Sequence, residues 1–323
     1  MPVISPPRRT GLLATAVAVA LVTTLAGPAT AAEAPISHVR VVAELSAADG
    51  QRPENITLEP DGSAVVTFAF SRQVARIDRA GQVDVLATLP APPAGASTPV
   101  LASPFLGGIV RTHDGTLYFL YATGTADLTG LWRLRPGGAP ERIAALPADS
   151  LPNGLALDRH GRLLYATDSV LGTVWRIPVG GGTPVRWATG PALEARGFLG
   201  ANGVKVHNGA VWVSNLDQGT VLRLPVTHRG TAGPVEVRAT GLVNIDDIAF
   251  TGSGNTLLAA INADNEVALV RSDGSHRVVL SGADGLRNPT SLAVRGSRVL
   301  VAGAAYFITD DPNLLTARIG HRP

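Results

Sequence analysis

From residue 54 onward, short apolar runs alternate with polar turns, and one arrangement of runs and turns recurs along the chain. Each copy opens on a polar or small residue, continues as an apolar strand, and turns at a pair such as Asp-Gly or His-Gly. A second apolar strand follows, and then a third that often ends in Arg-Leu or Arg-Ile. The six copies begin at Glu54, Gly107, Asn153, Asn202, Asp246 and Thr290.

Successive starts lie 53, 46, 49, 44 and 44 residues apart, an interval typical of a four-stranded propeller blade. Six starts predict an all-β fold, a six-bladed β-propeller. The leftover strand His38–Leu45 is expected to pair into the last blade and close the ring, since this removes an exposed sheet edge. Two stacked β-sandwiches would not explain the regular interval. No stretch keeps a helical apolar period over three turns, so we expect no substantial helix.

The first 31 residues follow a different pattern. Arg8 and Arg9 precede a 15-residue apolar run, which ends before the small-residue site Ala29-Thr30-Ala31. This three-part pattern predicts a signal peptide at residues 1–31, cleavage after Ala31 and a secreted propeller domain at residues 32–323. An N-terminal membrane anchor is the alternative, but the run is short for a span. No later stretch reaches roughly 18 uninterrupted apolar residues, so no membrane partner is expected after cleavage.

Composition removes several kinds of chemistry. The chain has no cysteine, which excludes thiolate metal sites and cysteine nucleophiles, so any metal must take oxygen or imidazole ligands. The 27 basic and 25 acidic residues come into balance without Arg8 and Arg9, and Lys205 is the only lysine. Such a chain lacks the basic surplus of a nucleic-acid binder, so we expect no nucleic acid partner.

The residues that open the copies are the first candidates for chemistry. In a propeller the first strand of each blade runs along the central axis, so these residues converge at one mouth of the tunnel. Two carboxylates and two amides among them, Glu54, Asn153, Asn202 and Asp246, suit a calcium ion, which takes six to eight oxygen ligands. Asn-Gly is also a common turn dipeptide, and a turn role is the alternative for Asn153 and Asn202.

The second strand of each blade ends at the same mouth. Its last residues include Asp168, Asn215 and Asn262, which are candidate substrate contacts or partners of the residues that bind the metal. Asp and Asn also favour the turns that end strands, which is the alternative explanation for each. Asp247 follows Asp246 directly, and the pattern leaves open which of the two faces the axis.

The blade rhythm and these residues resemble the regucalcin/gluconolactonase (senescence marker protein) family and, more distantly, the phosphotriesterase and paraoxonase-type calcium propellers. The resemblance covers roughly residues 40–310. It implies a calcium ion at the axis held by Glu54 in PENITLEPDG, Asn153 in PNGLALDRHGR, Asn202 in ANGVKV and Asp246 in IDDIAF. The chain departs from the family in the residues that follow these sites, Asn55, Gly154 and Asp247, and the family's contacts to a sugar lactone are not evident.

Two functions from different classes remain. The first is an exported calcium-dependent hydrolase that acts on a lactone or related ester, with Asp246 and Glu54 as catalytic carboxylates beside a calcium that polarises the carbonyl. The second is a non-enzymatic propeller that binds a ligand or a protein at the mouth of its tunnel. For either we expect a monomer, and for the first a small-molecule substrate.

Overall fold

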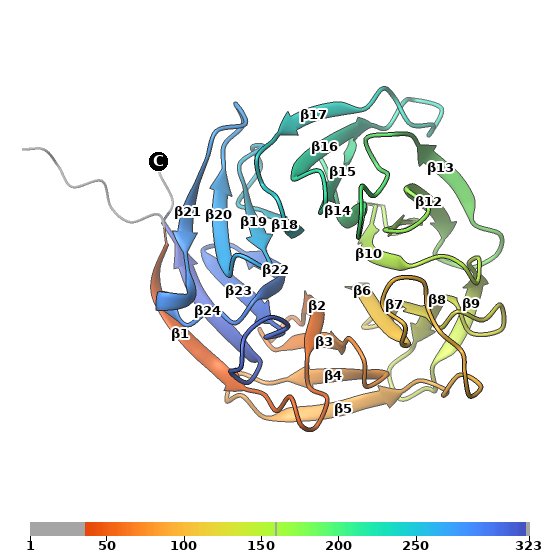
Figure 1. The fold of residues 1–323 in the computed structure, drawn as a ribbon, viewed down its shortest axis with the longest axis horizontal. Helices are drawn as coiled ribbons and strands as arrows, with labels where there is room; N and C mark the ends of the chain where they lie inside the picture. Colours follow the sequence, from red (N-terminus) through yellow and green to blue (C-terminus); the bar gives the residue numbers. More distant parts are fainter. Residues whose placement is uncertain (1–35, 159, 321–323) are drawn as a thin grey trace, which may run out of the picture. The chain divides into compact units, whose positions relative to one another are not determined.

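The computed structural model describes residues 36–158 and 160–320, which belong to one compact unit. The predicted signal peptide and its cleavage site lie outside the described residues. The described chain forms six four-stranded antiparallel sheets arranged as propeller blades around a central axis (Figure 1). The six-bladed all-β prediction is confirmed.

The four strands of a blade run from the axis to the rim. The innermost strands are β2 (Pro53–Leu58), β6 (Phe105–Arg111), β10 (Pro152–Leu157), β14 (Ala201–His207), β18 (Ile245–Phe250) and β22 (Pro289–Arg295). The second strands are β3 (Ala64–Phe68), β7 (Leu117–Ala122), β11 (Leu163–Asp168), β15 (Ala210–Asn215), β19 (Leu257–Ile261) and β23 (Arg298–Gly303). The third strands are β4 (Gln73–Ile77), β8 (Gly130–Leu134), β12 (Thr173–Pro178), β16 (Thr220–Pro225), β20 (Glu266–Val270) and β24 (Asn313–Ile319). The outermost strands are β5 (Val83–Thr88), β9 (Glu141–Ala145), β13 (Val185–Thr189), β17 (Glu236–Ala239), β21 (His276–Leu280) and β1 (Ile36–Glu44).

The strand β1 comes from the start of the described chain and completes the sixth blade. It pairs antiparallel with β24, from Ile36 opposite Ile319 to Glu44 opposite Asn313. The predicted ring closure is therefore confirmed, and the sixth blade is built from the two ends of the described chain. Because β1 covers β24, the last blade has no more exposed edge than the others.

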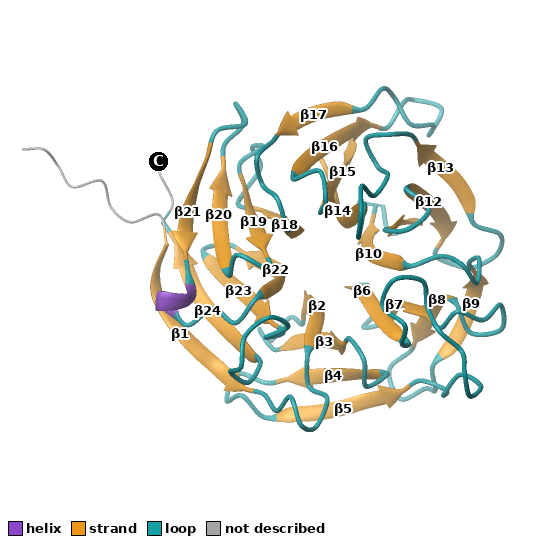
Figure 2. Ribbon diagram, in the orientation of Figure 1, coloured by secondary structure: helices purple, strands orange, loops and turns teal. Residues whose placement is uncertain are grey.

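Apolar side chains fill the spaces between neighbouring sheets. Strand β7, for example, is buried along its whole length, and Leu106 and Phe119 pack with Val65 of the preceding blade. Strands covered on both faces read as continuous apolar runs. One short 3-10 turn, η1 (Gly282–Asp284), is the only helical element among residues 36–158 and 160–320 (Figure 2). The described part of the chain contains no helix that is long and apolar enough to span a bilayer.

Candidate metal and substrate site

Every innermost strand has an irregular register at the residue that opens its blade. The pairing of β10 with β11, for example, shifts between Pro152 and Leu155, and equivalent shifts occur in β2, β6, β14, β18 and β22. A β-bulge bends a strand and re-aims a side chain. The bulges therefore lie at the residues that open the six copies of the repeat.

The glycines after the two asparagines are needed for close packing at the axis. A Cβ on Gly154 would lie 2.4 Å from the carbonyl oxygen of Asn202, and one on Gly203 would lie 2.4 Å from the Asp247 carboxylate. Both Asn-Gly pairs lie inside strands, β10 and β14. The turn interpretation of Asn153 and Asn202 is therefore wrong, and the glycines instead permit neighbouring strands to approach.

Hydroxyl groups of the second strands hold the site backbone in place. Thr67 donates to the carbonyl oxygen of Gly107 at 2.7 Å, and Ser214 donates to that of Asp246 at 2.6 Å. Thr167 makes the same contact with the carbonyl oxygen of Asn202. Each bond runs from one blade to the opening residue of the next, so the positions of the site residues are coupled around the ring.

The four predicted metal ligands line one cavity of about 300 Å³ at this mouth. Glu54, Asn153, Asn202 and Asp246 are all buried, each with 7% or less of its surface exposed. The remaining lining is mostly apolar and comes from residues such as Phe70, Phe105, Phe198, Leu199, Leu216 and Phe307.

Burial makes the two carboxylates hard to ionise. Burial raises the pKa of Glu54 from 4.5 to about 7; a hydrogen bond from Tyr306 opposes this rise and the charge of Asp247 adds to it. The pKa of Asp246 is raised well above its ordinary value, first by burial and then by the charges of Glu54 and Asp247. Two carboxylates that repel each other in a buried cavity favour a bound cation or proton.

The donors present fit a hard divalent cation. The side-chain oxygen of Asn202 is buried with no hydrogen-bond partner, which is costly unless something else binds it. No three histidine, cysteine, aspartate or glutamate side chains among the described residues group closely enough to hold a metal by themselves. A metal in this cavity would therefore depend on the amides of Asn153 and Asn202 as well as on the two carboxylates, a donor set suited to calcium.

Asp247 lies at the axis as well but has other partners. Its carboxylate accepts from Lys205 Nζ at 2.6 and 2.8 Å and from Ser291 Oγ at 2.6 Å. Asp246 therefore lines the cavity, and the buried Asp247 forms an ion pair with the partly exposed Lys205. Three carboxylates and one ammonium around the axis leave a formal charge of two minus, which a divalent cation would balance.

Tyr306 is a site residue that the repeat did not reveal. Its hydroxyl donates to Glu54 Oε2 at 2.6 Å, and its ring lines the cavity beside Phe307. Burial raises the pKa of this phenol well above its usual value, and the negative charge of Glu54 raises it further. Tyr306 lies in the loop between β23 and β24, drawn in dark blue in Figure 1. This loop lies outside the repeated positions, so periodicity carried no signal for it.

The three predicted substrate contacts occupy different environments. Asp168 accepts from the backbone of Leu151 and Leu171 and from the indole of Trp175, and Asn215 bonds to the loop before β14. Neither lines the cavity. Asn262 does line it, and its amide donates to the carbonyl oxygens at the start of β22. A substrate role for the three stays a prediction.

Comparisons with known proteins agree with the fold. Regucalcin, a calcium-binding protein from Agrobacterium tumefaciens, is similar with a TM-score of 0.63 at 16% identity, over 89% of this chain and 97% of that one. A gluconolactonase from Xanthomonas campestris is similar with a TM-score of 0.60 at 16% identity, over 90% of this chain and 98% of that one. A virginiamycin B lyase from Staphylococcus aureus is similar with a TM-score of 0.54 at 16% identity, over 86% of this chain and 99% of that one.

These likenesses show the fold. The expected resemblance to gluconolactonase and regucalcin propellers is confirmed at that level. No family model matches the chain, and no curated protein sequence matches it. Because one of the similar structures is a lyase, the fold alone does not indicate which reaction a protein catalyses.

Proposed function

We propose that the protein is a calcium-dependent hydrolase of lactones or related esters. The observation that carries the proposal is the buried, unpartnered oxygen of Asn202 beside the two carboxylates Glu54 and Asp246. Together with Asn153, these residues would hold the ion. Calcium bound there would act as a Lewis acid toward a carbonyl oxygen.

The protein's own groups have distinct roles in this proposal. Asp246, which lines the cavity beside Glu54, is the carboxylate that would accept a proton from the attacking water. Tyr306 fixes the orientation of Glu54 through its hydrogen bond to Oε2. Its buried phenol, whose pKa is raised, stays protonated and keeps that bond.

The lining of the cavity favours apolar substrates. Phe70, Phe198 and Phe307 are 41, 44 and 64% exposed around the mouth, where they are available to contact a ligand. Such a rim would bind alkyl or aryl groups and would exclude water from the reacting ester. A sugar lactone, with several hydroxyls, would find few polar partners on it. The proposed substrates are therefore lactones or esters with an apolar side chain.

Calcium content and ester hydrolysis test the proposal together. Purified protein should contain about one calcium ion, and it should hydrolyse phenyl acetate and an alkyl lactone faster than gluconolactone. Chelation should remove this activity and calcium should restore it. Glu54→Gln should lose calcium and activity, whereas the matched control Glu141→Gln, in an exposed ion pair with Arg133, should keep both. Full activity in chelator would rule out the calcium role.

The non-enzymatic alternative also has one supporting observation. Tyr306 occupies one carboxylate oxygen of Glu54, and an aromatic rim suits simple ligand capture as well as catalysis. Calcium binding without turnover of any ester or lactone in the panel would favour this alternative.

We also propose that the protein is exported and monomeric. The support is the sequence pattern of residues 1–31 alone for export, and the closed ring, which leaves no unpaired blade, for the monomer. Protein recovered from its source should begin near Ala32 and run as a single chain by sedimentation. An intact N-terminus on cytoplasmic protein would contradict export.

A further inference from the structure

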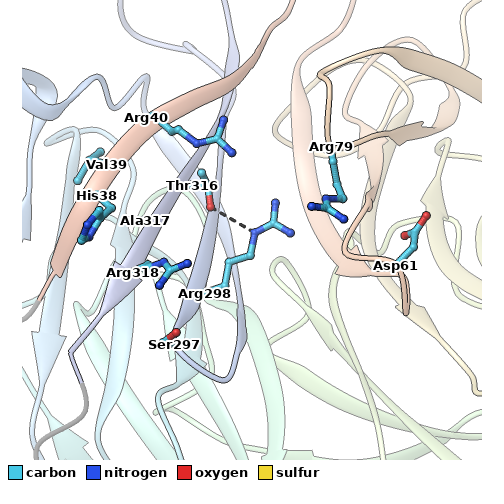
Figure 3. Close-up of a pocket in the computed structure, with 10 residues that line it drawn as sticks. All are labelled: His38, Val39, Arg40, Asp61, Arg79, Ser297, Arg298, Thr316, Ala317 and Arg318. Atoms are coloured by element: carbon cyan, nitrogen blue, oxygen red, sulfur yellow. Dashed lines mark hydrogen bonds between the residues drawn. The ribbon is translucent and has the colours of Figure 1, made fainter.

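A second cavity, of about 800 Å³, lies where the sixth blade meets the first. Its lining residues come from the ends of β1, β23 and β24 and from the turns after β2 and β4. These segments are at the strand ends opposite the openings that carry Glu54 and Asp246, so the cavity is on the other face of the ring. Figure 3 shows that the side chains of Arg298 and Arg79 extend toward each other from the two blades.

The repeat supplies an internal standard for this cavity. In the first, second and fourth blades the arginine near the end of the third strand lies directly opposite an acidic residue of the outermost strand. These pairs are Arg76 with Asp84, Arg133 with Glu141 and Arg223 with Glu236. In the sixth blade the corresponding arginine is Arg318, and its partner on β1 is Ser37. The acidic partner is therefore missing at this blade, as it is in the third blade, where Val185 lies opposite Arg176.

The second strand departs from the repeat as well. Opposite the third-strand arginine, the first four blades place the uncharged residues Val65, Tyr118, Tyr165 and Trp212. The sixth blade places Arg298 opposite Arg318. Two like charges directly opposite each other on neighbouring strands are destabilising, so the position is unfavourable for folding alone.

The positive charges of this cavity are poorly compensated within the described chain. Four arginines line it, namely Arg40, Arg79, Arg298 and Arg318, and none has a carboxylate within 4.0 Å among the described residues. The one acidic residue in the lining, Asp61, pairs with Arg76 at 2.6 Å. Arg298 is held in place by Thr316 Oγ1 at 3.4 Å and the carbonyl oxygen of Gly62 at 2.8 Å.

The surroundings of Arg298 also disfavour its charge. Burial lowers the pKa of its guanidinium, and the neighbouring charges of Arg40 and Arg79 lower it further. An anion between the two blades would relieve this repulsion. Guanidinium groups bind phosphate oxygens through paired hydrogen bonds, and the hydroxyl of Ser297 offers a further polar partner at the same cavity.

We propose that this cavity binds a small anion that carries two or more phosphate groups. One phosphate group would engage Arg298 and Arg318 on the sixth blade, and another would engage Arg79 across the gap. The volume of the cavity, about 800 Å³, and its four guanidiniums favour such a ligand over a single carboxylate. The site is independent of the axial carboxylates and of the hydrolase proposal.

Calorimetric titration of the full chain with tripolyphosphate, pyrophosphate and phosphate tests the proposal. The buffer must be free of calcium, because tripolyphosphate itself binds this ion. Affinity should fall from tripolyphosphate to pyrophosphate to phosphate, and it should weaken as salt is added. Arg298→Val, which restores the residue of the first blade, should weaken tripolyphosphate binding tenfold or more. Glu54→Gln should leave it unchanged.

A matched control separates a built site from a generally basic surface. Arg277→Val removes an exposed arginine from β21 of the fifth blade and should change the affinity less than twofold. Thermal melts establish that each variant is folded, and Arg318→Ser gives a second variant of the same site. No binding of tripolyphosphate by the wild type, or equal losses in Arg277→Val and Arg298→Val, would overturn the proposal.

Discussion

The two faces of the propeller depart from the repeat in opposite ways. At the mouth, the openings of four blades place oxygen donors around one axis, with buried carboxylates whose charge is only partly balanced by Lys205. On the other face, a single blade junction gathers guanidiniums that have no carboxylate within 4.0 Å among the described residues. In both places the residues are unfavourable for folding alone. In a repeat protein, the blades that keep the common residue at a position show what folding requires there. A blade with a different residue at that position is therefore a candidate for a function.

The sixth blade links the two faces, because it carries both Tyr306 and the pairing surface for β1 and Arg40. A chain that begins at Ser46 lacks β1 and should lose both sites at once. Strand β24 would then present an unpaired edge, and the apolar contacts of Ile36 and Ala43 would be lost. We expect aggregation on purification, whereas a chain that begins at Ile36 should stay soluble. A soluble Ser46 chain with an unchanged melting temperature would show that β1 is dispensable.

The ion pair of Lys205 and Asp247 should give the next largest effect. Asp247→Asn leaves Lys205, whose side chain is 27% exposed, without its partner and should lower the free energy of unfolding by about 3 kcal/mol, the low end for a buried pair. The double variant Asp247→Asn with Lys205→Met should recover much of this loss, because the Lys205 charge is removed together with its partner. Urea unfolding of the wild type, the two single variants and the double variant measures the coupling. If the effects of the two substitutions on the free energy of unfolding are additive, Lys205 and Asp247 do not stabilise the protein as an ion pair.

The repeat explains how much of this could be predicted from the sequence. The opening residues Glu54, Asn153, Asn202 and Asp246 recur in register, so their convergence followed from the blade interval. The repeat could not show whether a glycine lies in a turn or allows a neighbouring strand to approach closely, as Gly154 does.

The remaining site residues depend on contacts that the repeat does not encode. Tyr306 belongs to the loop between the second and third strands of its blade, which is longer than the equivalent loops of the other blades, and it bonds to a residue 252 positions away. Arg318 meets Ser37 only because the ring closes with the other end of the described chain. Such pairs become visible when strand pairing is known.

The carboxylates at the mouth should make the metal-free protein sensitive to pH. Because the pKa of Glu54 rises from 4.5 to about 7 on folding, the folded state binds more protons than the unfolded state between these values. Stability in chelator should therefore fall as pH rises from 4.5 to 7, by about 3 kcal/mol, and then level off. Calcium should remove most of this loss.

Glu54→Gln separates this carboxylate from its neighbours. The variant in chelator should be at least as stable as the wild type at pH 8, because a repelling charge has been removed, and its pH dependence should be flatter. Thermal melts from pH 4.5 to 8, with calcium and with chelator, measure both effects. The same pH slope in wild type and variant would show that Glu54 ionises normally.

The smallest expected effect tests the opposite face. Ser37→Glu restores the acidic partner that the first, second and fourth blades place opposite the third-strand arginine, here Arg318. A cross-strand pair of opposite charges contributes roughly 0.2–1 kcal/mol, so the variant should be more stable than the wild type by about 0.5 kcal/mol in low salt. It should also bind tripolyphosphate more weakly, since the new carboxylate occupies one guanidinium and repels the anion. Ser37→Gln, which adds similar bulk without charge, should change neither property by as much. A gain in stability with unchanged tripolyphosphate affinity would place the anion away from Arg318 and leave the blade junction as a folding feature alone.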